Sequence, residues 1–288
     1  MLEEASVKPH ASAALPAAWA DLAHPPQLNP LQAAWRFLDK TLVITGVEII
    51  KLRHDPTELL TRAIQPALWL LVFGQVFAQL RAIPTGSLPY IEFMAPGILA
   101  QSVLFISIFY GISIIWERDL GILHKYLASP TPRAALVLGK SLSAGVRGLA
   151  QAVMIYLLSL LLGVRMNWDL FAILGVVVVV ILGAALFSTF SMIIACLVKT
   201  RERFMGIGQV LTMPLFFASN AIYPIAIMPA WLQVISTINP LSYMVDALRT
   251  LMLAQGGSGS LPLDFAVLLG ANALLLAIAA RLYPTIVR

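Results

Sequence analysis

The segment 116–133, WERDLGILHKYLASPTPR, is a short charged stretch that separates two long apolar runs of the chain. It predicts a short helix in which Leu120, Leu123 and Leu127 form an apolar stripe along one face. Pro130 ends this helix, because proline cannot continue a helix interior. A short helix of this kind suits docking into a groove on another protein, and a loop that lies on lipid headgroups is the alternative.

The composition around this segment is that of a membrane protein. Of the 288 residues, 59% are hydrophobic and 11% are charged, and the mean hydropathy is +0.86, whereas a soluble domain carries about 25% charged residues. We expect the formal net charge of +5 to reflect cytoplasmic loops that face anionic lipid, and not binding to nucleic acid. The single cysteine, Cys196, excludes an internal disulfide.

Two segments precede the apolar runs. Residues 1–30 are rich in alanine and proline and lack a sustained apolar core, so we expect a flexible cytoplasmic tail and no secretory signal peptide. Residues 31–54 predict an amphipathic interfacial helix, because Trp35 and several leucines recur at helical spacing beside basic residues. Packing of this helix on protein is the alternative.

Six apolar runs are long enough to cross about 30 Å of hydrocarbon. They cover approximately residues 63–80, 93–116, 141–164, 170–198, 204–220 and 265–281. Residues 55–288 are therefore expected to form one all-α, polytopic transmembrane domain of six helices. Pro66 predicts a bend in the first run, and Arg147 is expected to extend from the third run toward the near surface.

No charge occurs between Arg203 and Asp246. This uncharged stretch includes the fifth run and is too long for one crossing. Prolines interrupt it at positions 214, 224, 229 and 240. Residues 221–253 therefore predict a re-entrant external segment of short helices that dips back without crossing, with shielding by protein. A hairpin of two full spans is the rival interpretation, and it would place the C-terminus outside.

Charge favours the re-entrant interpretation. With both termini and the connectors 117–140 and 199–203 in the cytoplasm, 16 of the 19 basic residues lie inside, and only Arg81, Arg165 and Arg249 lie outside. This asymmetry is the one found in multi-pass membrane proteins.

The sequence contains no pattern of catalytic or metal-ligating residues, and the four histidines are scattered without ligand spacing. Gly139-Lys140-Ser141 resembles the end of a phosphate-binding loop, but Ala134 occupies the position of the required first glycine. The middles of the six runs contain no Asp, Glu, His or Lys, and the polar residues there are uncharged: Gln75, Gln101, Gln151, Gln209, Asn220 and Asn272. An ion-coupled carrier usually has ionisable groups there, so energy for uphill transport is expected from a partner. An ion-coupled carrier or channel acting alone, and a structural scaffold, remain the alternatives.

Two motifs resemble the permease subunits of ABC-2 type exporters, which have the type V exporter fold and include daunorubicin-resistance and nodulation-type permeases. Glu117-Arg118 followed by residues 121–130 is similar to the cytoplasmic coupling segment of that family, and the stretch Asn239 to Arg249, NPLSYMVDALR, is similar to its signature before the last helix. The resemblance implies export of a hydrophobic or amphiphilic cargo across the bacterial inner membrane. It also implies a homodimer of permeases with two copies of an ABC ATP-binding subunit, which would bind ATP and Mg. This chain itself would bind no cofactor.

The resemblance and the helical faces together give three sets of candidate site residues. The ATPase-coupling set is Glu117, Arg118, Leu120, Leu123, His124 and Leu127 within the segment 117–133. The candidate translocation pathway, chosen by shared helical faces, is Phe105, Phe109, Met213, Phe216, Phe217 and Asn220. The external re-entrant set is Tyr223, Pro224, Asn239, Pro240, Tyr243, Asp246 and Arg249, in which Asp246 and Arg249 are expected to pair.

Overall fold

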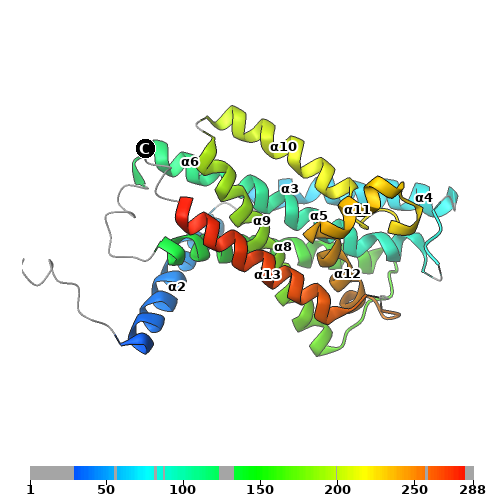
Figure 1. Cartoon of the computed structure of the whole chain (residues 1–288). Coiled ribbons are helices and arrows are strands. Elements are labelled where there is room, and N and C mark those ends of the chain that lie inside the picture. The colour runs from blue at the N-terminus through cyan, green and yellow to red at the C-terminus, as the bar shows by residue number, and fades with distance from the viewer. Residues whose placement is uncertain are drawn as a thin grey trace, which may run out of the picture. The chain divides into compact units, whose positions relative to one another are not determined.

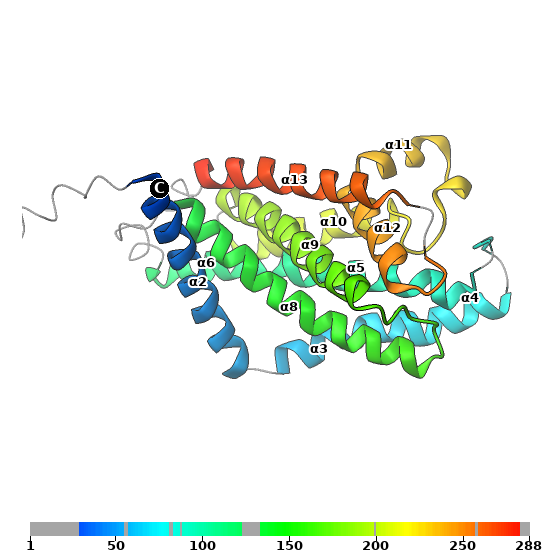
Figure 2. The ribbon, with the colours of Figure 1, turned by 90° about the horizontal axis from the view of Figure 1, so that it is seen from below.

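The computed structural model describes residues 29–54, 57–80, 83–86, 88–122, 133–198, 200–256 and 259–282. The regular elements in these ranges are helices (Figures 1 and 2), and one isolated antiparallel bridge joins Met166 to Leu253. The chain divides into two units, the first ending at Arg36 and the second beginning at Phe37. The described part of the first unit is the start of helix α2 (Pro30–His54), where Leu31 and Trp35 are exposed.

In the second unit, α2 buries threonines and leaves its leucines exposed. Thr41 and Thr45 are buried, and the hydroxyl of Thr45 donates to the carbonyl of Gly139 at 3.1 Å. Leu38 and Leu42, which the sequence places on the apolar face, are exposed. The close approach depends on Gly139, because a Cβ at that position would lie 2.8 Å from the Cβ of Ile44. The helix exists as expected, and its position at the membrane interface stays a prediction.

The first apolar run forms α3 (Thr57–Leu68), a π-helical turn η1 (Trp69–Phe73) and α4 (Gly74–Leu80). The π-helical turn follows Pro66, which has no N–H to donate to the carbonyl four residues earlier. The predicted disturbance at Pro66 therefore takes the form of a local change in helix geometry. The apolar helix Ile64–Leu80 is shorter than the helices that clearly have the length to span a membrane.

The core is built around α5 (Tyr90–Tyr110) and its continuation α6 (Ile112–Asp119), which pack against α8 (Arg133–Leu161), α9 (Leu170–Leu197) and α12 (Pro240–Met252). Nearly all residues of α5 are buried, and Figure 2 shows it enclosed by its neighbours. Gly97 on α5 permits a close approach, because a Cβ there would lie 2.2 Å from the carbonyl oxygen of Ala221.

Within the described residues, four helices have the length and apolar composition to cross a membrane: Tyr90–Asp119, Ala134–Leu161, Leu170–Leu197 and Leu261–Leu282. They coincide with the second, third, fourth and sixth predicted runs. The protein is thus an all-α, polytopic membrane protein with about four long apolar helices, and the count of six spans stays a prediction. The last of these helices is α13 (Leu261–Leu282).

Helix α8 begins earlier than the apolar run that predicted it. The sequence placed the start near residue 141, because Lys140 carries a charge, but the helix extends back to Arg133. Lys140 is buried inside the structure, where its Nζ lies 2.7 Å from the carboxylate of Glu117. Because Glu117 pairs with Lys140 inside the structure, the charge of Lys140 is compensated and the helix continues through this residue.

The stretch 201–253 is a series of helical pieces, and Pro224, Pro229 and Pro240 lie at their boundaries as predicted, whereas Pro214 lies inside a helix without ending it. It consists of α10 (Arg201–Phe217), the 3₁₀ turn η2 (Ile225–Ile227), α11 (Ala230–Ile238) and α12. These pieces pass the end of α10 and lead into α12, close to α5 (Figure 1). Their re-entrant position in the membrane stays a prediction.

Candidate functional site: a polar pocket between three helices

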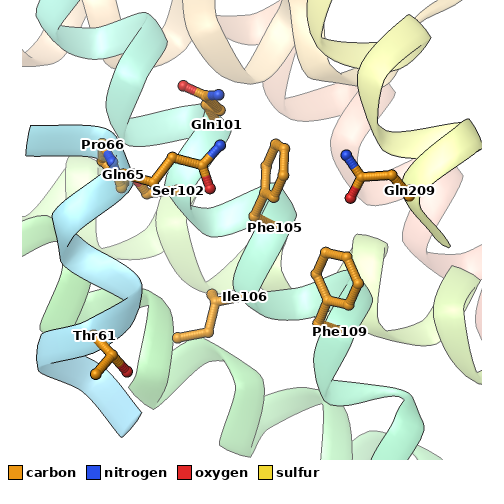
Figure 3. Close-up of a pocket in the computed structure, with 9 residues that line it drawn as sticks. All are labelled: Thr61, Gln65, Pro66, Gln101, Ser102, Phe105, Ile106, Phe109 and Gln209. Carbon is orange, nitrogen blue, oxygen red and sulfur yellow. The ribbon is translucent and has the colours of Figure 1, made fainter. Parts of the chain in front are cut away.

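A pocket of about 320 Å³ lies between α3, α5 and α10 (Figure 3). Its lining consists of Thr61, Gln65, Pro66, Gln101, Ser102, Phe105, Ile106, Phe109 and Gln209. Two of the predicted pathway residues, Phe105 and Phe109, therefore line one pocket. Their ring centroids are 6.3 Å apart, because positions four apart lie on the same face of α5.

Each of the three helices contributes an amide side chain to this pocket. Gln65 comes from α3, Gln101 from α5 and Gln209 from α10. Figure 3 shows Gln65 and Gln209 extending from opposite sides toward Phe105. Gln101 is buried, and its Oε1 has no hydrogen-bond partner among the described residues. Ser102 is already engaged, since its hydroxyl donates to the carbonyl of Ile98 at 2.7 Å.

The structure separates the remaining predicted pathway residues from this pocket. Phe216 is fully buried, with its ring 6.0 Å from that of Trp69 in an edge-on arrangement, and Phe217 is exposed. Helix α10 ends at Phe217, so Asn220 does not continue the helical face that the sequence assigned to it with Met213. Met213 is half-buried and is not among the pocket residues. A pathway role for these four residues stays a prediction without support from the pocket.

Sequence reasoning noted Gln101 and Gln209 as uncharged polar residues but did not assign them to the pathway, and it did not single out Thr61 or Gln65. The available signal was polarity within an apolar run. Polarity alone did not show that these amides share one site. Only the packing of α3, α5 and α10 places Gln65, Gln101 and Gln209 around the same pocket.

At the other end of α5 and α6, the start of the segment 117–133 is held by ion pairs. Glu117 is buried and paired with Lys140 of α8. Asp119 pairs with Arg118 at 3.1 Å and with Arg201 of α10 at 2.9 Å. The guanidinium of Arg201 also lies 4.0 Å from the centroid of the Trp116 ring. These contacts connect the exit of α6 to both α8 and α10.

The predicted coupling set is only partly described. Leu120 is 68% exposed, as a docking residue requires, whereas Glu117 is inside and cannot itself contact a partner in this conformation. Leu123, His124 and Leu127 lie outside the described residues. The coupling role of the whole set stays a prediction.

Arg147 does not extend to the surface, and that prediction was wrong. The residue is buried, and its guanidinium lies 4.3 Å from the centroid of the Tyr110 ring. The hydroxyl of Ser143 hydrogen-bonds to the hydroxyl of Tyr110 at 2.9 Å. The aromatic ring of α5 therefore accommodates the cation inside the helix bundle.

The stretch Asn239 to Arg249 begins with a residue that joins two helices. The side-chain oxygen of Asn239 accepts from the N–H of Leu241 at 3.0 Å and so caps α12, and Pro240 occupies the first position of that helix. The Nδ2 of the same side chain donates to the carbonyls of Leu215 at 2.7 Å and Ala218 at 3.2 Å. Asn239 thus satisfies carbonyls at the end of α10 while it starts α12.

Asp246 and Arg249 pair as expected, at 3.2 Å, inside a larger cluster. Arg249 is buried and also donates to the carbonyls of Asn220 at 2.8 Å and Phe93 at 3.3 Å, with its guanidinium 3.9 Å from the Phe93 ring centroid. The amide of Asn220 donates to Asp246. Burial raises the pKa of Asp246, which Arg249 and Asn220 oppose, and burial lowers the pKa of Arg249 to about 10.

The tyrosines of the external set close local turns. The hydroxyl of Tyr223 donates to the carbonyl of Phe217 at 2.6 Å, and that of Tyr243 donates to the carbonyl of Thr237 at 2.7 Å. Pro224 precedes the 3₁₀ turn η2. On the neighbouring loop, the exposed Arg165 pairs with the buried Glu92 at 3.3 Å. The external set is thus a hydrogen-bonded assembly that ties the ends of α10, α12 and α5.

Comparison with known proteins identifies the family of this chain. The profile of the ABC-2 type transporter family matches residues 40–253. The chain is 30% identical to the ycf38 protein of Cyanophora paradoxa, over 75% of this chain and 74% of the relative. It is 27% identical to the daunorubicin resistance ABC transporter permease protein DrrB1 of Streptomyces coeruleorubidus, over 80% of this chain and 81% of the relative. It is 24% identical to nodulation protein J of Sinorhizobium fredii, over 60% of this chain and 65% of the relative.

Proposed function

The chain belongs to the ABC-2 type transporter family, and from this premise we propose that it exports a hydrophobic or amphiphilic cargo through a path that includes the pocket between α3, α5 and α10. As an ABC transporter permease it is a multi-pass transmembrane component, and in this family ATP is bound by a partner subunit. A drug-like molecule, a lipid and a lipid-linked glycan are the cargo classes that fit the proposal. The name of the relative DrrB1 supports a cargo of the first class.

The observation that carries the proposal is the exposure of amide groups on an otherwise apolar face. Gln65 and Gln209 are exposed beside exposed apolar side chains of the same helices, such as Ile64 and Val210. Amides that face hydrocarbon without partners are costly. We therefore propose that a second copy of the permease covers this face, and that the two pockets meet in a polar path through a homodimer.

We propose that each permease of the pair binds one copy of an ABC ATP-binding subunit, with ATP and Mg held by that subunit. The segment 117–133 is the proposed contact, supported by the exposure of Leu120 beside ion pairs that reach α8 and α10. A push on this segment would act on Glu117 and Asp119 and, through them, on two helices that flank α5. The helix 31–54 would lie on the cytoplasmic surface beside the same contact.

The proposed topology has six spans, with both termini in the cytoplasm of a bacterium and the domain 55–288 in the plasma membrane. The first and fifth spans would be Ile64–Leu80 and α10, which are shorter than the other four. Residues 221–253 would form the re-entrant external segment, and residues 1–30 a cytoplasmic tail. The positive charge distribution along the sequence supports this orientation.

Co-purification with the ATP-binding subunit tests the proposal. Leu120→Asp, and Leu123→Asp in the same segment, should weaken the complex and lower its ATP turnover, because a carboxylate would enter an apolar contact. Leu161→Asp is the matched control, since Leu161 is 84% exposed at the end of α8 and lies outside the segment 117–133. Transport driven by an ion gradient in liposomes that contain the permease alone would instead favour the ion-coupled carrier.

A further inference from the structure

We propose that a groove between α8 and α9 holds one membrane phospholipid with a zwitterionic headgroup of the phosphatidylethanolamine class, as a resident lipid and not as cargo. Figure 2 shows α8 and α9 side by side. The groove has a volume of about 460 Å³, and none of its described lining residues belongs to the pocket between α3, α5 and α10. The assignment to the outer leaflet rests on the proposed orientation, whereas the binding site itself does not depend on the proposed function.

The lining of the groove consists of aliphatic and aromatic side chains. Six of the ten lining residues come from α8, between Leu149 and Leu160, and three come from α9, between Ile173 and Val177. The tenth is Trp168, on the loop that joins the two helices. Within a membrane, contacts of such a surface are stabilised by close van der Waals packing. An alkyl chain seated in the groove supplies this packing.

The length of the groove matches one leaflet of the membrane. At 1.5 Å per residue, Leu149 to Leu160 covers about 16 Å of α8, which is about half of the 30 Å of hydrocarbon. Tyr156 and Trp168 lie toward the loop, with ring centroids 6.5 Å apart in an edge-on arrangement. Tyrosine and tryptophan are enriched at the level of the headgroups. The groove therefore runs from headgroup level to about the middle of the hydrocarbon, as the acyl chain of one leaflet does.

Two exposed charges flank Trp168 on this loop. Arg165 keeps 66% of its side chain exposed although its Nε pairs with Glu92 at 3.3 Å, and a guanidinium has five N–H groups, so further donors remain for a phosphate. Asp169 is exposed and caps α9, where its Oδ2 accepts from two backbone N–H groups at 3.1 and 3.2 Å. A headgroup with a phosphate and an ammonium complements this pair of charges. An anionic headgroup would meet the carboxylate, and choline has no N–H to donate to it.

A second copy of the permease is the other candidate for this groove. The exposed amides of Gln65 and Gln209 place the proposed dimer contact on α3 and α10, and neither helix contributes a described residue to the groove. The rim residues Val153, Leu157 and Leu160 are apolar and more than half exposed. Lipid covers such a rim without leaving a polar group unpaired. These observations favour lipid over protein as the occupant.

The test measures lipid binding to the full-length permease, purified in detergent without added lipid, by native mass spectrometry. The probes are phosphatidylethanolamine, phosphatidylcholine, phosphatidylglycerol and diacylglycerol, all with the same two acyl chains. We expect one phosphatidylethanolamine per permease, with a Kd about fivefold lower than those of phosphatidylcholine and phosphatidylglycerol, the effect of one exposed ionic contact. Diacylglycerol should bind more weakly than all three, because it lacks the phosphate that Arg165 contacts.

Three variants make the result specific. Val177→Phe places a ring in the groove and should raise the Kd of phosphatidylethanolamine about tenfold, because the ring takes the space of the acyl chain. Val178→Phe is the matched control and should leave the Kd unchanged, because Val178 is the next residue of α9, is exposed and lies outside the lining. Asp169→Asn keeps the helix cap, since asparagine caps as well as aspartate. It should raise the Kd of phosphatidylethanolamine to that of phosphatidylcholine.

Each contrary result overturns the proposal. Equal Kd values in Val177→Phe and Val178→Phe, or no bound phosphatidylethanolamine, exclude the groove as its site. Tighter binding of phosphatidylglycerol, equal binding of diacylglycerol, or unchanged selectivity in Asp169→Asn excludes the assigned headgroup. Loss of the dimer mass in Val177→Phe with unchanged lipid binding identifies a second copy as the occupant. The Asp169→Asn result decides the matter even where Val177→Phe does not fold, and no step of the measurement uses ATP or transport, so it is independent of the proposed export.

Discussion

Replacing Arg249 by methionine keeps the approximate length of the side chain and removes its guanidinium group. In the native protein this group donates to Asp246 and to the carbonyls of Asn220 and Phe93, and it lies over the Phe93 ring. The variant therefore leaves a carboxylate without its cation and two carbonyls without their charged donor. Removing one partner of a buried pair costs about 3–5 kcal/mol. Because the side chain of Asp246 remains 33% exposed, we expect the lower end, about 3 kcal/mol.

Unfolding in mixed micelles with increasing dodecyl sulfate, followed by tryptophan fluorescence, measures this loss as a change in the free energy of unfolding. Arg203→Met is the matched control, because Arg203 is exposed on α10, and its replacement should change the free energy by less than about 0.5 kcal/mol. The loss of unfolding free energy in Arg249→Lys should lie between those of Arg249→Met and Arg203→Met. An ammonium keeps the charge but lacks the planar guanidinium group that reaches several acceptors at once.

The double variant with Asp246→Asn distinguishes a charge effect from a packing effect. Removing the carboxylate together with the cation leaves no orphaned charge, so the double variant should be more stable than the sum of the single changes predicts, by about 1–3 kcal/mol. A loss below about 1 kcal/mol in Arg249→Met, or strictly additive losses in the double variant, would refute the reasoning that this cluster holds α12 to α5 through a paired charge.

Two other predictions follow from packing and from topology. Gly97→Ala should destabilise the protein by about 1–3 kcal/mol, because its methyl group would meet the backbone of Ala221, whereas Gly270→Ala, with no atom within 4 Å, should be neutral or stabilising in the same unfolding assay. In a cysteine-free background, Arg165→Cys should react with an impermeant maleimide in intact cells and Arg201→Cys only after permeabilisation; the reverse pattern would contradict the proposed orientation.

The long helices were predictable because their signal is local. A run of about 20 apolar residues identifies a span without knowledge of its neighbours, and four such runs coincide with long apolar helices. Breaks were predictable for the same reason, since prolines act on their own helix. The prolines after α10 therefore gave the correct sequence of short helical pieces.

The burial of Lys140 and Arg147 was not predictable, because their partners lie far away in sequence, whereas Asp246 and Arg249 are three residues apart and their pairing was predicted. Lys140 looked like the end of a connector, yet its partner Glu117 is 23 residues away and both are buried. Arg147 is held by Tyr110 on another helix. A single sequence shows each charge without its partner, so it assigns the charge to the surface by default.

The candidate site shows the same division between local and distant information. Phe105 and Phe109 lie four apart on one helix, so their shared face was predictable and they line the pocket together. Gln65 and Gln209 are on helices far apart in sequence, and only the packing of α3, α5 and α10 places them around the same space. Asn220 was placed with α10 because the helix was expected to continue, but α10 ends at Phe217.

The order of polar residues along α5 and α6 connects the proposed motor contact to the pocket. Glu92 pairs with Arg165 near one end, Glu117 pairs with Lys140 near the other, and Gln101 lies between them. At 1.5 Å per residue, the two glutamates are about 37 Å apart along the helical path, which exceeds the hydrocarbon thickness of about 30 Å.

This spacing allows both ion pairs to sit near the boundaries of the membrane, where charge costs least, with the neutral pocket at membrane depth between them. A displacement at Glu117 would then reach the pocket along one nearly continuous helical rod. The break in that rod is at Gly111, where a Cβ would meet the hydroxyl of Ser191 on α9 at 2.0 Å. Because even a methyl group at Gly111 would meet Ser191, Gly111→Ala is expected to disturb the packing of this break against α9.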